Sequence, residues 1–484
     1  MRSPFLVTVA VFSSLSVALL AQAPPPSIHS ALAVDSGYLA NPGATPVVVY
    51  QQRLQFAGSE WLQFHFRDHT NLPEGSFVRL TGKRDAGMQR HDGRTLVEWD
   101  HVSAMFNGDE VTLELVAAPF SSGNRVVLDG VWQGQSGTPG VQSICGVDDR
   151  VQSFDPRQGR LWLGCTGWLI SQDVMLTAGH CTTTGTRILE LNVPLSTAGG
   201  SVVRANPRDQ YPYTELAGLN AGVGQDWRVC RVGTNSTTGL LPTQANGGQW
   251  YALGTVPAST AGQNIRITGY GVDSDTPTFS QVQQTHVGPL STISATSLCY
   301  ATDTTGGNSG SPIIHANTGR AIGIHTHSGC TSTGGCNNGT RIDRADLQAA
   351  IASARGSTAS VGTYGVGCHG LTFVSSGVPA LGTTVTIGAI GVPAGVVGAA
   401  MNVGFAQQNV DLGGVGMPGC RLLNTLDIWF PMPSTSPATS TGLAIPNDSS
   451  VYGVTLFAQA AVLVPGINAL GAATSNGAQL VTGW

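Results

Sequence analysis

Two segments of this chain contain the residue types of covalent catalysis. Ser309 stands in the glycine-rich segment Gly306–Pro312, Gly-Gly-Asn-Ser-Gly-Ser-Pro, and His180 stands far upstream in Leu176–Cys181. A serine hydroxyl is a weak nucleophile at neutral pH and needs a positioned base. Glycines on both sides of Ser309 would let backbone N–H groups point into one small space, where an oxyanion could sit. The two segments therefore predict a serine nucleophile with a histidine base.

A third group must hold the histidine in the right tautomer and stabilise its protonated form. Asp226 fits this role because it stands between the two motifs, at the start of the apolar segment 226–232. Asp209 is the alternative, although the prolines around it indicate a loop. Asp173 and Asp303 lie too close in sequence to the other two partners to serve easily. Asp226 is therefore the predicted third member of the catalytic set.

The composition indicates the kind of fold that must position these groups. Of the 484 residues only 11% are charged, 64 are glycine, and Lys83 is the one lysine. Few charged helix formers together with many glycines, threonines and valines favour an all-β protein. The formal net charge of −5 gives no basic surface, so nucleic-acid binding is disfavoured. The histidines match no zinc-ligand spacing, so we expect no metal and no other cofactor.

The chain divides into a leader and three blocks. Residues 1–23 have the pattern of a secretory signal peptide, which predicts a secreted protein and leaves attachment to the cell envelope open. Period-two alternation predicts a β-sandwich-like N-terminal domain over 24–140, either a pro-region or an accessory domain. The alternating segments are 61–66, 76–80 and 111–116. Residues 141–355 hold the two motifs and end in a predicted helix over 344–351.

Residues 362–484 form a third block that is rich in Gly, Val, Ala and Pro and almost uncharged. Residues 383–406 are long enough to span a membrane, but their glycines and proline argue for strands and turns. The segment 451–460 predicts one more strand. We therefore expect a second small β-sandwich here. The two flanking β domains could contact cell surfaces or glycans, by analogy of fold alone.

Nine cysteines fit an oxidising compartment, and the odd count leaves at least one thiol outside an intramolecular pair. The candidate disulfides are Cys165 with Cys181, Cys330 with Cys336, and Cys368 with Cys420. The first pair would brace His180, and the second could close a glycine-rich turn. The pairing of Cys145, Cys230 and Cys299 is left open.

Four segments together resemble the chymotrypsin-fold serine proteases. They are Cys165–Ile170, Leu176–Cys181, Asp226-Trp227 and Gly307–Pro312. The order His, Asp, Ser matches that family, and the serine loop is most similar to the bacterial branch of V8-like glutamyl endopeptidases. Asp148-Asp149-Arg150 also resembles the start of the mature domain in that branch. The resemblance covers the middle block, under half of the chain, and implies two six-stranded antiparallel β-barrels with the triad in the cleft between them.

The resemblance also implies a role for each matching residue. Ser309 would be the nucleophile, His180 the general base and then acid, and Asp226 the group that orients the imidazole. The backbone N–H groups of Gly307 and Ser309 would form the oxyanion hole. Asn308 replaces the aspartate that pairs with a new N-terminus in the trypsin branch, so trypsin-style activation is not expected.

Three residues are candidates for the primary specificity pocket. In the glutamyl branch, a histidine at the place of His325 binds the substrate carboxylate, and a hydroxyl at the place of Thr304 assists it. Against this, Asp303 lies at the offset where an aspartate selects Arg or Lys in the trypsin branch. We favour acidic P1 residues, with P1 Arg or Lys as the alternative. His327 and His315 are expected to be surface or structural residues.

These observations favour a secreted serine endopeptidase that acts on protein or peptide substrates through an acyl-enzyme. The alternative from another class is a non-catalytic binding or adhesion protein on a protease scaffold, with the flanking β domains as its binding modules. The full set of predicted catalytic residues argues for the enzyme.

Overall fold

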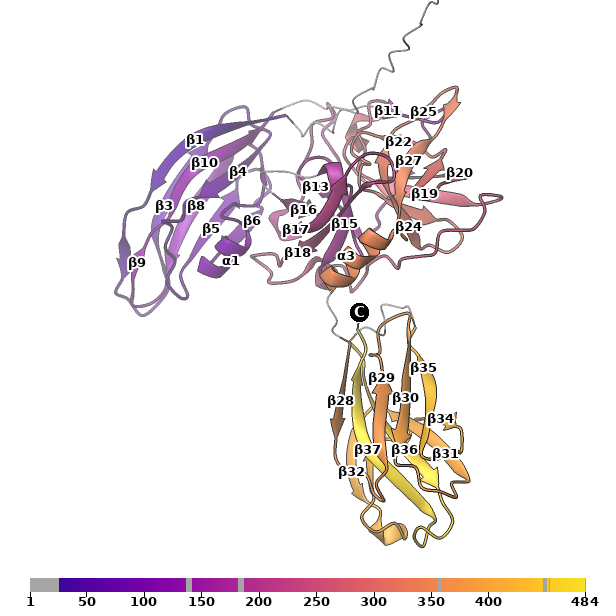
Figure 1. Ribbon diagram of the computed structural model, residues 1–484. Helices are drawn as coiled ribbons and strands as arrows, with labels where there is room; N and C mark the ends of the chain where they lie inside the picture. The colour runs from indigo at the N-terminus through magenta and orange to yellow at the C-terminus, as the bar shows by residue number, and fades with distance from the viewer. Residues whose placement is uncertain are drawn as a thin grey trace, which may run out of the picture.

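Strands dominate the chain and form three consecutive blocks, coloured from indigo to yellow in Figure 1. The computed structural model describes residues 26–135, 142–181, 187–355, 359–446, 451 and 453–483. The predicted signal peptide, 1–23, lies outside these described residues. The all-β prediction is confirmed.

Two antiparallel sheets of four strands make up most of the first block, in the orders β1-β10-β4-β7 and β3-β8-β5-β6. The bounds are β1 Ser27–Asp35, β2 Leu39–Asn41, β3 Val47–Gln55, β4 Trp61–Phe66, β5 Phe77–Gly82, β6 Met88–His91, α1 Gly93–Glu98, β7 Phe106–Asn107, β8 Glu110–Ala117, β9 Ser121–Asn124 and β10 Val127–Gly134. The three alternating segments predicted as strands are β4, β5 and β8. They bury Phe64, Leu80 and Leu113 in the core of the block.

His91, at the end of β6, is a buried histidine in this core. Its ring lies edge-on to Trp99 and Phe66, with ring centroids 5.4 and 6.1 Å away. Neither ring nitrogen has a hydrogen-bond partner among the described residues. Burial lowers the pKa of His91 to about 3. The folded chain therefore keeps this ring neutral at pH values where an unfolded chain would protonate it.

Acid is expected to destabilise the chain in part through His91. Between the ordinary histidine pKa of 6.5 and the folded value of about 3, the unfolded state binds the extra proton, so stability falls as pH falls. The slope is at most about 1.4 kcal/mol per pH unit. His91→Leu should flatten this dependence, because it removes the group whose pKa burial lowers. Urea unfolding at pH 7 and pH 4.5 measures the difference, and equal slopes for His91→Leu and the wild type would contradict it.

The middle block contains two closed six-stranded antiparallel barrels, as the resemblance implies. The first has the strand order β13-β14-β15-β18-β17-β16. In the second, β20 pairs with β21 and closes the ring β20-β19-β23-β24-β27-β21, while β12 adds to β20. One apolar cluster runs through both barrels, from Trp168 and Leu176 in the first to Ile313 and Ile324 in the second.

The elements of the middle block follow the expected order along the chain. Their bounds are β11 Gln142–Ser143, β12 Val151–Gln152, β13 Gln158–Leu161, β14 Thr166–Leu169, β15 Val174–Thr177, η1 Gly179–Cys181, β16 Ile188–Glu190, η2 Pro207–Asp209, β17 Gln210–Asn220, β18 Asp226–Val232, α2 Pro242–Ala245, β19 Asn264–Gly269, η3 Pro277–Phe279, β20 Gln284–Ile293, β21 Ser297–Tyr300, β22 Thr304–Thr305, β23 Pro312–His315, β24 Ala321–His327, β25 Cys330–Thr331, β26 Gly334–Gly335, β27 Asn337–Arg341 and α3 Ala345–Arg355. Helix α3 confirms the helix predicted over 344–351 and runs on to Arg355. It buries Leu347 and Ile351 against the barrels.

In the third block a five-stranded sheet, β28-β37-β36-β31-β34, accompanies a three-stranded sheet, β29-β30-β35. The bounds are β28 Ser360–Tyr364, β29 Thr372–Ser376, β30 Thr384–Ile390, β31 Gly398–Gly404, β32 Gln407–Asp411, η4 Gly413–Val415, β33 Arg421–Asn424, β34 Ile428–Met432, β35 Ala438–Ala444, β36 Thr455–Leu463 and β37 Ala472–Val481. The segment 383–406 forms β30 and β31, so the prediction of strands and turns is confirmed. Within the described ranges, no helix combines the length and apolar character needed to cross a membrane.

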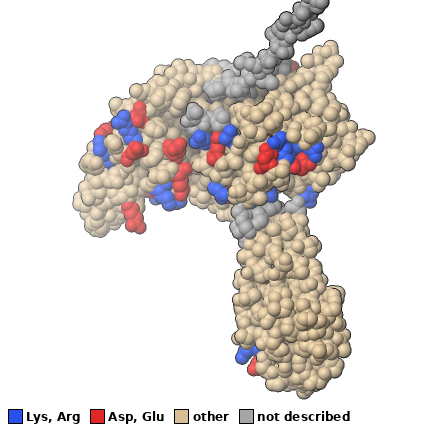
Figure 2. Space-filling model, in the orientation of Figure 1, with Lys and Arg blue, Asp and Glu red and all other residues tan. Residues whose placement is uncertain are grey.

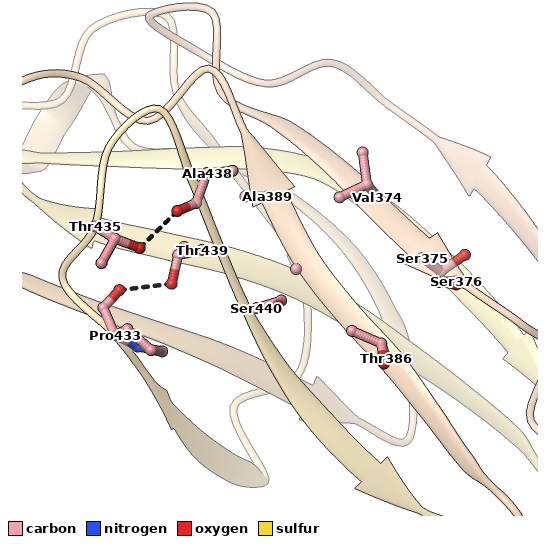
Figure 3. Close-up of a pocket in the computed structure, with 11 residues that line it drawn as sticks. Val374, Ser375, Ser376, Thr386, Ala389, Pro433, Thr435, Ala438, Thr439 and Ser440 are labelled. Carbon is pink, nitrogen blue, oxygen red and sulfur yellow. Dashed lines mark hydrogen bonds between the residues drawn. The ribbon is translucent and has the colours of Figure 1, made fainter.

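The third block has an almost uncharged surface. Figure 2 shows acidic and basic side chains gathered on the first two blocks, with very few on the third. A pocket of about 410 Å³ lies on its three-stranded sheet (Figure 3). Small side chains such as Ser375, Thr386 and Ser440 line it. Its lining offers hydroxyl groups and apolar surface but no charge.

Four disulfides cross-link the chain. They join Cys145 to Cys330, Cys165 to Cys181, Cys299 to Cys336 and Cys368 to Cys420. The predicted pairs of the first barrel and of the third block are confirmed, but the predicted bridge between Cys330 and Cys336 is wrong. Strand β21 pairs with β27 and sets Cys299 opposite Asn338, which brings it to Cys336 instead. Cys230 is the free cysteine and is buried.

Candidate active site

His180 and Asp226 form a closely bonded pair in the first barrel. His180 lies in the turn η1, directly after β15, and Asp226 opens β18. The Asp226 carboxylate accepts two hydrogen bonds from His180, one from Nδ1 at 2.6 Å and one from the backbone N–H at 3.0 Å. Asp226 is only 1% exposed. Because the Nδ1 proton points at the carboxylate, the Nε2 lone pair is left free to accept another proton.

Only glycine fits directly before His180. A Cβ at Gly179 would lie 1.8 Å from the carbonyl oxygen of Leu219 and 2.9 Å from Oδ1 of Asp226. Leu219 lies near the end of β17, which pairs with β18 beside Asp226. The turn therefore packs directly onto the backbone where these two strands meet. This close approach explains how the sequence Ala-Gly-His-Cys sets the histidine against the aspartate.

Strand β14 of the first barrel holds the serine loop, residues 306–312. Thr166 donates from its backbone N–H to the carbonyl oxygen of Ser309 at 2.8 Å. Its hydroxyl donates to the carbonyl oxygen of Gly307 at 2.9 Å. The indole N–H of Trp168 donates to the carbonyl oxygen of Gly310, also at 2.9 Å. Three carbonyl groups of the loop are thus fixed on one barrel.

The serine loop lies against the turn that carries His180. The carbonyl oxygen of Ser309 is 3.7 Å from Sγ of Cys181, although 128 positions separate these residues in the sequence. A Cβ at Gly310 would lie 2.2 Å from Oγ1 of Thr177, and Gly310 has a φ of +89°, in the left-handed region. The two motifs that the sequence singled out are therefore neighbours in space.

The serine loop contains two backbone N–H groups that are candidate donors to an oxyanion, those of Gly307 and Ser309. The φ of Gly307 is +107°, and a Cβ there would lie 2.3 Å from the carbonyl oxygen of Tyr270, so glycine is required. The N–H of Asn308 donates to the carbonyl oxygen of Thr305 at 3.0 Å. The N–H groups of Gly307 and Ser309 have no hydrogen-bond partner in the described part of the chain. Two unpaired N–H groups of one loop are the kind of donor pair that binds an oxyanion.

His325 lies in β24, directly beside the serine loop. Its backbone N–H donates to the carbonyl oxygen of Ser311, and its carbonyl oxygen accepts from the N–H of Gly310, both at 2.8 Å. The residue is 3% exposed. Burial lowers the pKa of His325 to about 3, and the neighbouring His327 and His180 add to this effect. The ring is therefore neutral at neutral pH.

Tyr300 sets the tautomer of the His325 ring. Its hydroxyl oxygen lies 2.6 Å from Nδ1 of His325. Burial raises the pKa of Tyr300 well above its ordinary value, so the hydroxyl keeps its proton. Since this proton has no other acceptor among the described residues, Tyr300 donates to Nδ1. The neutral imidazole of His325 then carries its own proton on Nε2.

Asp303 is bonded to the start of the middle block. Its Oδ1 accepts from the backbone N–H of Cys145 at 2.7 Å, and its Oδ2 accepts from that of Asp149 at 3.3 Å. Its own N–H donates to Nδ1 of His286 at 2.8 Å. Asp303 is 1% exposed, and burial raises its pKa above the ordinary value. Backbone donors thus occupy both oxygens of this carboxylate.

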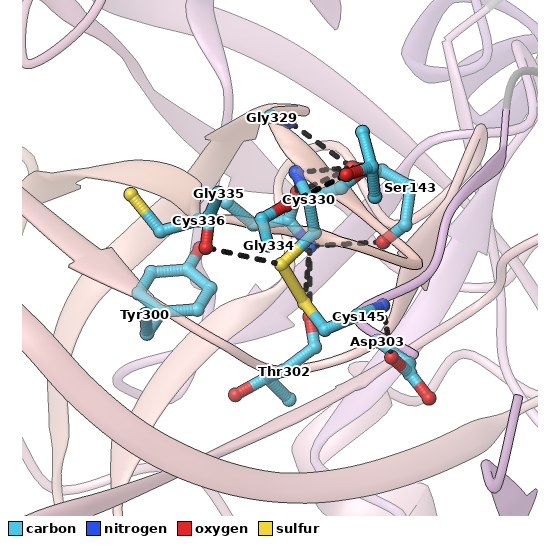
Figure 4. Close-up of a disulfide and its surroundings, with 12 residues drawn as sticks. Ser143, Cys145, Tyr300, Thr302, Asp303, Gly329, Cys330, Gly334, Gly335 and Cys336 are labelled. Atoms are coloured by element: carbon cyan, nitrogen blue, oxygen red, sulfur yellow. Dashed lines mark hydrogen bonds between the residues drawn. A yellow bond between two sulfur atoms is a disulfide. The ribbon is translucent and has the colours of Figure 1, made fainter. Parts of the chain in front are cut away.

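The start of the middle block is also tied to the loop that follows β24. Figure 4 shows the disulfide between Cys145 and Cys330 and the hydrogen bonds around it. The hydroxyl oxygen of Ser143 accepts from the N–H groups of Gly329 and Cys330 at 3.0 and 3.1 Å. Strand β11 pairs with β22, with Ser143 opposite Thr304. Strand pairing with this segment therefore fixes the backbone of Thr304. Thr304 is 1% exposed.

His327 is a member of the site that the sequence did not reveal. It is 8% exposed, so of the two expected alternatives, surface or structural, the structure rules out the surface position and leaves the structural one. Its Nδ1 lies 4.0 Å from Oδ2 of Asp226, and its ring is edge-on to His180 with centroids 6.2 Å apart. The pairing of β24 with β27 is irregular between the two histidines, since His325 lies opposite Gly339 and His327 opposite Asn338. No local pattern in the sequence predicts such a bulge.

Comparison of the sequence with known proteins gives a match to a protease family within the middle block. Residues 165–324, which lie inside the middle block, match the family profile described as the trypsin-like peptidase domain. The middle block is a V8-like domain of the chymotrypsin fold. The two barrels of this V8-like domain are those that the resemblance implied.

Two relatives and one solved structure are similar to the chain. The glutamyl endopeptidase of Bacillus licheniformis is 27% identical over 223 residues, which cover 42% of this chain and 66% of that protein. The extracellular metalloprotease of Bacillus subtilis strain 168 is 29% identical over 189 residues, 37% of this chain and 54% of that protein. A structure of Glu endopeptidase in complex with MPD has 23% identity and a TM-score of 0.34, covering 43% of this chain and 97% of its own. The chain thus spans less than two thirds of either relative.

Proposed function

We propose that the V8-like domain is a serine endopeptidase, with Ser309 as nucleophile, His180 as general base and Asp226 as the group that positions His180. The observation that supports this most is the Asp226 carboxylate, which accepts from both Nδ1 and the backbone N–H of His180. This pairing leaves Nε2 as the proton acceptor, on a turn against which the serine loop packs. A base of fixed tautomer beside a serine on a glycine-rich loop is the arrangement that acyl transfer requires.

The reaction proceeds in two halves. In the first, Oγ of Ser309 attacks the scissile carbonyl carbon while Nε2 of His180 takes the hydroxyl proton. The C–N bond then breaks, and the same Nε2 returns the proton to the leaving amine, which gives an ester on Ser309. In the second half, water attacks this ester, His180 again takes and returns the proton, and the carboxylic acid product leaves. Asp226 stabilises the imidazolium at each stage.

The N–H groups of Gly307 and Ser309 would bind the oxyanion of both tetrahedral intermediates. They are candidates because they have no other partner in the described part of the chain and belong to a loop whose carbonyl groups are fixed on β14. Each such donor is worth roughly 3 kcal/mol in the transition state. The φ of Gly307, +107°, lies in the left-handed region that glycine adopts readily.

We propose further that the primary pocket accepts acidic P1 side chains. His325 supports this because Tyr300 leaves it with one proton, on Nε2, which can donate to a carboxylate. Asp303 argues against a basic P1 residue, since both of its oxygens accept from the backbone of Cys145 and Asp149. Thr304 could add a hydroxyl donor.

Peptides that differ only at P1 test this proposal. We expect higher kcat/KM for P1 Glu or Asp than for P1 Arg or Lys, and the preference should hold from pH 6 to pH 9 because His325 stays neutral there. His325→Leu should lower kcat/KM for the P1 Glu peptide about 10- to 100-fold, the loss of a hydrogen bond to a charged group. Hydrolysis of p-nitrophenyl acetate, which has no P1 carboxylate, should change less than about twofold.

A matched control is His315→Leu, at a histidine in the same barrel whose ring bonds to Gln263 and Thr318. It should leave both substrates unaffected. A wild-type preference for P1 Arg would contradict the proposed role of His325 and leave the serine chemistry standing.

We also propose that the protein acts outside the cytoplasm on protein or peptide substrates. Four disulfides fit an oxidising compartment, and the sequence of residues 1–23 predicts export. Contact of the flanking β domains with glycans or cell surfaces stays a prediction.

A further inference from the structure

We propose that the first block, residues 26–135, is a permanent part of the protease, which stays bound to the first barrel even when the chain between them is cut. This inference decides between the pro-region and the accessory domain that the sequence left open, and it does not depend on the catalytic proposal. In Figure 1 the first block lies beside the first barrel, near β16 and β17. Four kinds of contact join them.

Apolar side chains of the two blocks form one core. Trp162 and Ile188, both from the V8-like domain, belong to the same buried cluster as Phe64 and Phe106 of the first block. Ile188 is fully buried. The rings of Trp132 and Trp162 meet edge to face across the boundary, with centroids 5.9 Å apart. Separation of the blocks would expose this shared apolar surface to water.

Two side chains pair with backbone on the opposite side of the boundary. Asn107 of the first block donates from Nδ2 to the carbonyl oxygen of Arg204 at 2.9 Å and accepts from its N–H at 2.8 Å. Gln210 of β17 does the same in the other direction, since it donates to the carbonyl oxygen of Met105 at 2.8 Å and accepts from its N–H at 2.9 Å. Each amide satisfies both backbone groups of one buried residue, so separation would leave these groups without their partners.

A third contact extends along the segment that follows β18. The indole N–H of Trp99 donates to the carbonyl oxygen of Thr234 at 3.2 Å. The side-chain amide of Gln89 donates to Oγ of Ser236 at 3.1 Å. These bonds continue the boundary away from β16, so the first block contacts the barrel over several elements.

A buried charge cluster completes the boundary. Glu190 bonds to Arg160 at 3.0 Å and to Arg204 at 2.9 Å, and all three side chains are fully buried. The guanidinium of Arg204 lies over the ring of Trp61, 4.4 Å from its centroid. This contact between a buried guanidinium and an aromatic ring crosses the boundary, and separation of the blocks would remove it.

The boundary lies away from the candidate catalytic residues. The hydrogen bonds of His180, Asp226 and Ser309 within the described ranges all join them to residues of the V8-like domain. The first block meets β16, η2, the start of β17 and the segment after β18 instead. It can therefore remain bound without filling the site, unlike an inhibitory pro-segment.

The test is to cut the connection and ask whether the parts separate. A recognition sequence for a site-specific protease replaces residues 136–141 in full-length Ser309→Ala protein, which lacks the proposed nucleophile. After complete cleavage, size-exclusion chromatography with light scattering at micromolar concentration should give one species with the mass of the uncut chain. Two species, each with the mass of one fragment, would overturn the proposal.

A pair of asparagine variants then tests whether this boundary holds the fragments. Asn107→Ala removes the two bonds to Arg204 and a bond to Asp85 within the first block, while Asn71→Ala removes a bond to Gly123 within the first block. The dissociation constant of the cut Asn107→Ala complex should be about tenfold higher or more, because backbone groups of Arg204 lose their partner. Its fragments should also separate at a lower urea concentration. The cut Asn71→Ala complex should match the wild type. Equal dissociation of all three complexes would show that another surface holds them.

Discussion

Replacing Ser309 with alanine is expected to lower kcat for peptide hydrolysis roughly 10⁶-fold, with KM little changed. The substitution removes the attacking Oγ, and without it the imidazole of His180 has no nucleophile to activate. The fold should be retained, because the bond that holds this residue runs from the N–H of Thr166 to the backbone carbonyl oxygen of residue 309. Casein hydrolysis and the P1 Glu peptide measure the loss.

Ser311→Ala is the matched control for this variant. Ser311 lies two positions away on the same loop, is fully buried, and its hydroxyl has no hydrogen-bond partner among the described residues. Its removal should leave kcat within about twofold of the wild type. If Ser309→Ala keeps the activity of Ser311→Ala, the nucleophile is a different residue.

Replacing Asp226 with asparagine is expected to have the second largest effect, a loss of about 10⁴-fold in kcat. The carboxylate now accepts from both Nδ1 and the backbone N–H of His180. An asparagine side chain has one oxygen and would present an N–H2 group to one of these donors. The imidazole would then carry its proton on Nε2, the wrong tautomer for taking the proton of Ser309. Steady-state kinetics on the P1 Glu peptide measure this loss.

Asp209→Asn serves as the control, because Asp209 is the alternative that the sequence allowed. It lies in η2, where its Oδ1 accepts from the side-chain amide of Asn192 at 2.7 Å. This variant should keep kcat within about twofold of the wild type. A greater loss for Asp209→Asn than for Asp226→Asn would reverse the assignment.

Much of this site could be predicted from the sequence because its positions depend on local rules. Gly179 and Gly307 stand where a Cβ would collide with backbone, so these glycines mark the turns that carry His180 and Ser309. Asp226 opens an apolar strand, and the first residue of a strand beside a turn is well placed to meet that turn. The alternation of the first block and the glycines of 383–406 likewise predicted strands that the structure contains.

What the sequence could not supply were contacts between distant segments. Cys330 forms its disulfide with Cys145, 185 positions away, and not with the nearer Cys336 that the sequence suggested. Asp303 has the offset of a specificity residue, but its carboxylate binds the backbone of Cys145 and Asp149. His327 reaches Asp226 only because both barrels meet there. These pairings follow from sheet register and barrel packing, which no local pattern encodes.

The most direct test of the central claim is labelling with a fluorophosphonate, which reacts with a serine activated by a neighbouring base. Folded wild-type protein should take up one equivalent, and peptide mass spectrometry should find it on Ser309. Labelling should be absent in Ser309→Ala, slow in Asp226→Asn and unchanged in Ser311→Ala. A folded wild-type protein that is not labelled, or is labelled elsewhere, would contradict the assignment of Ser309, His180 and Asp226 as a catalytic set.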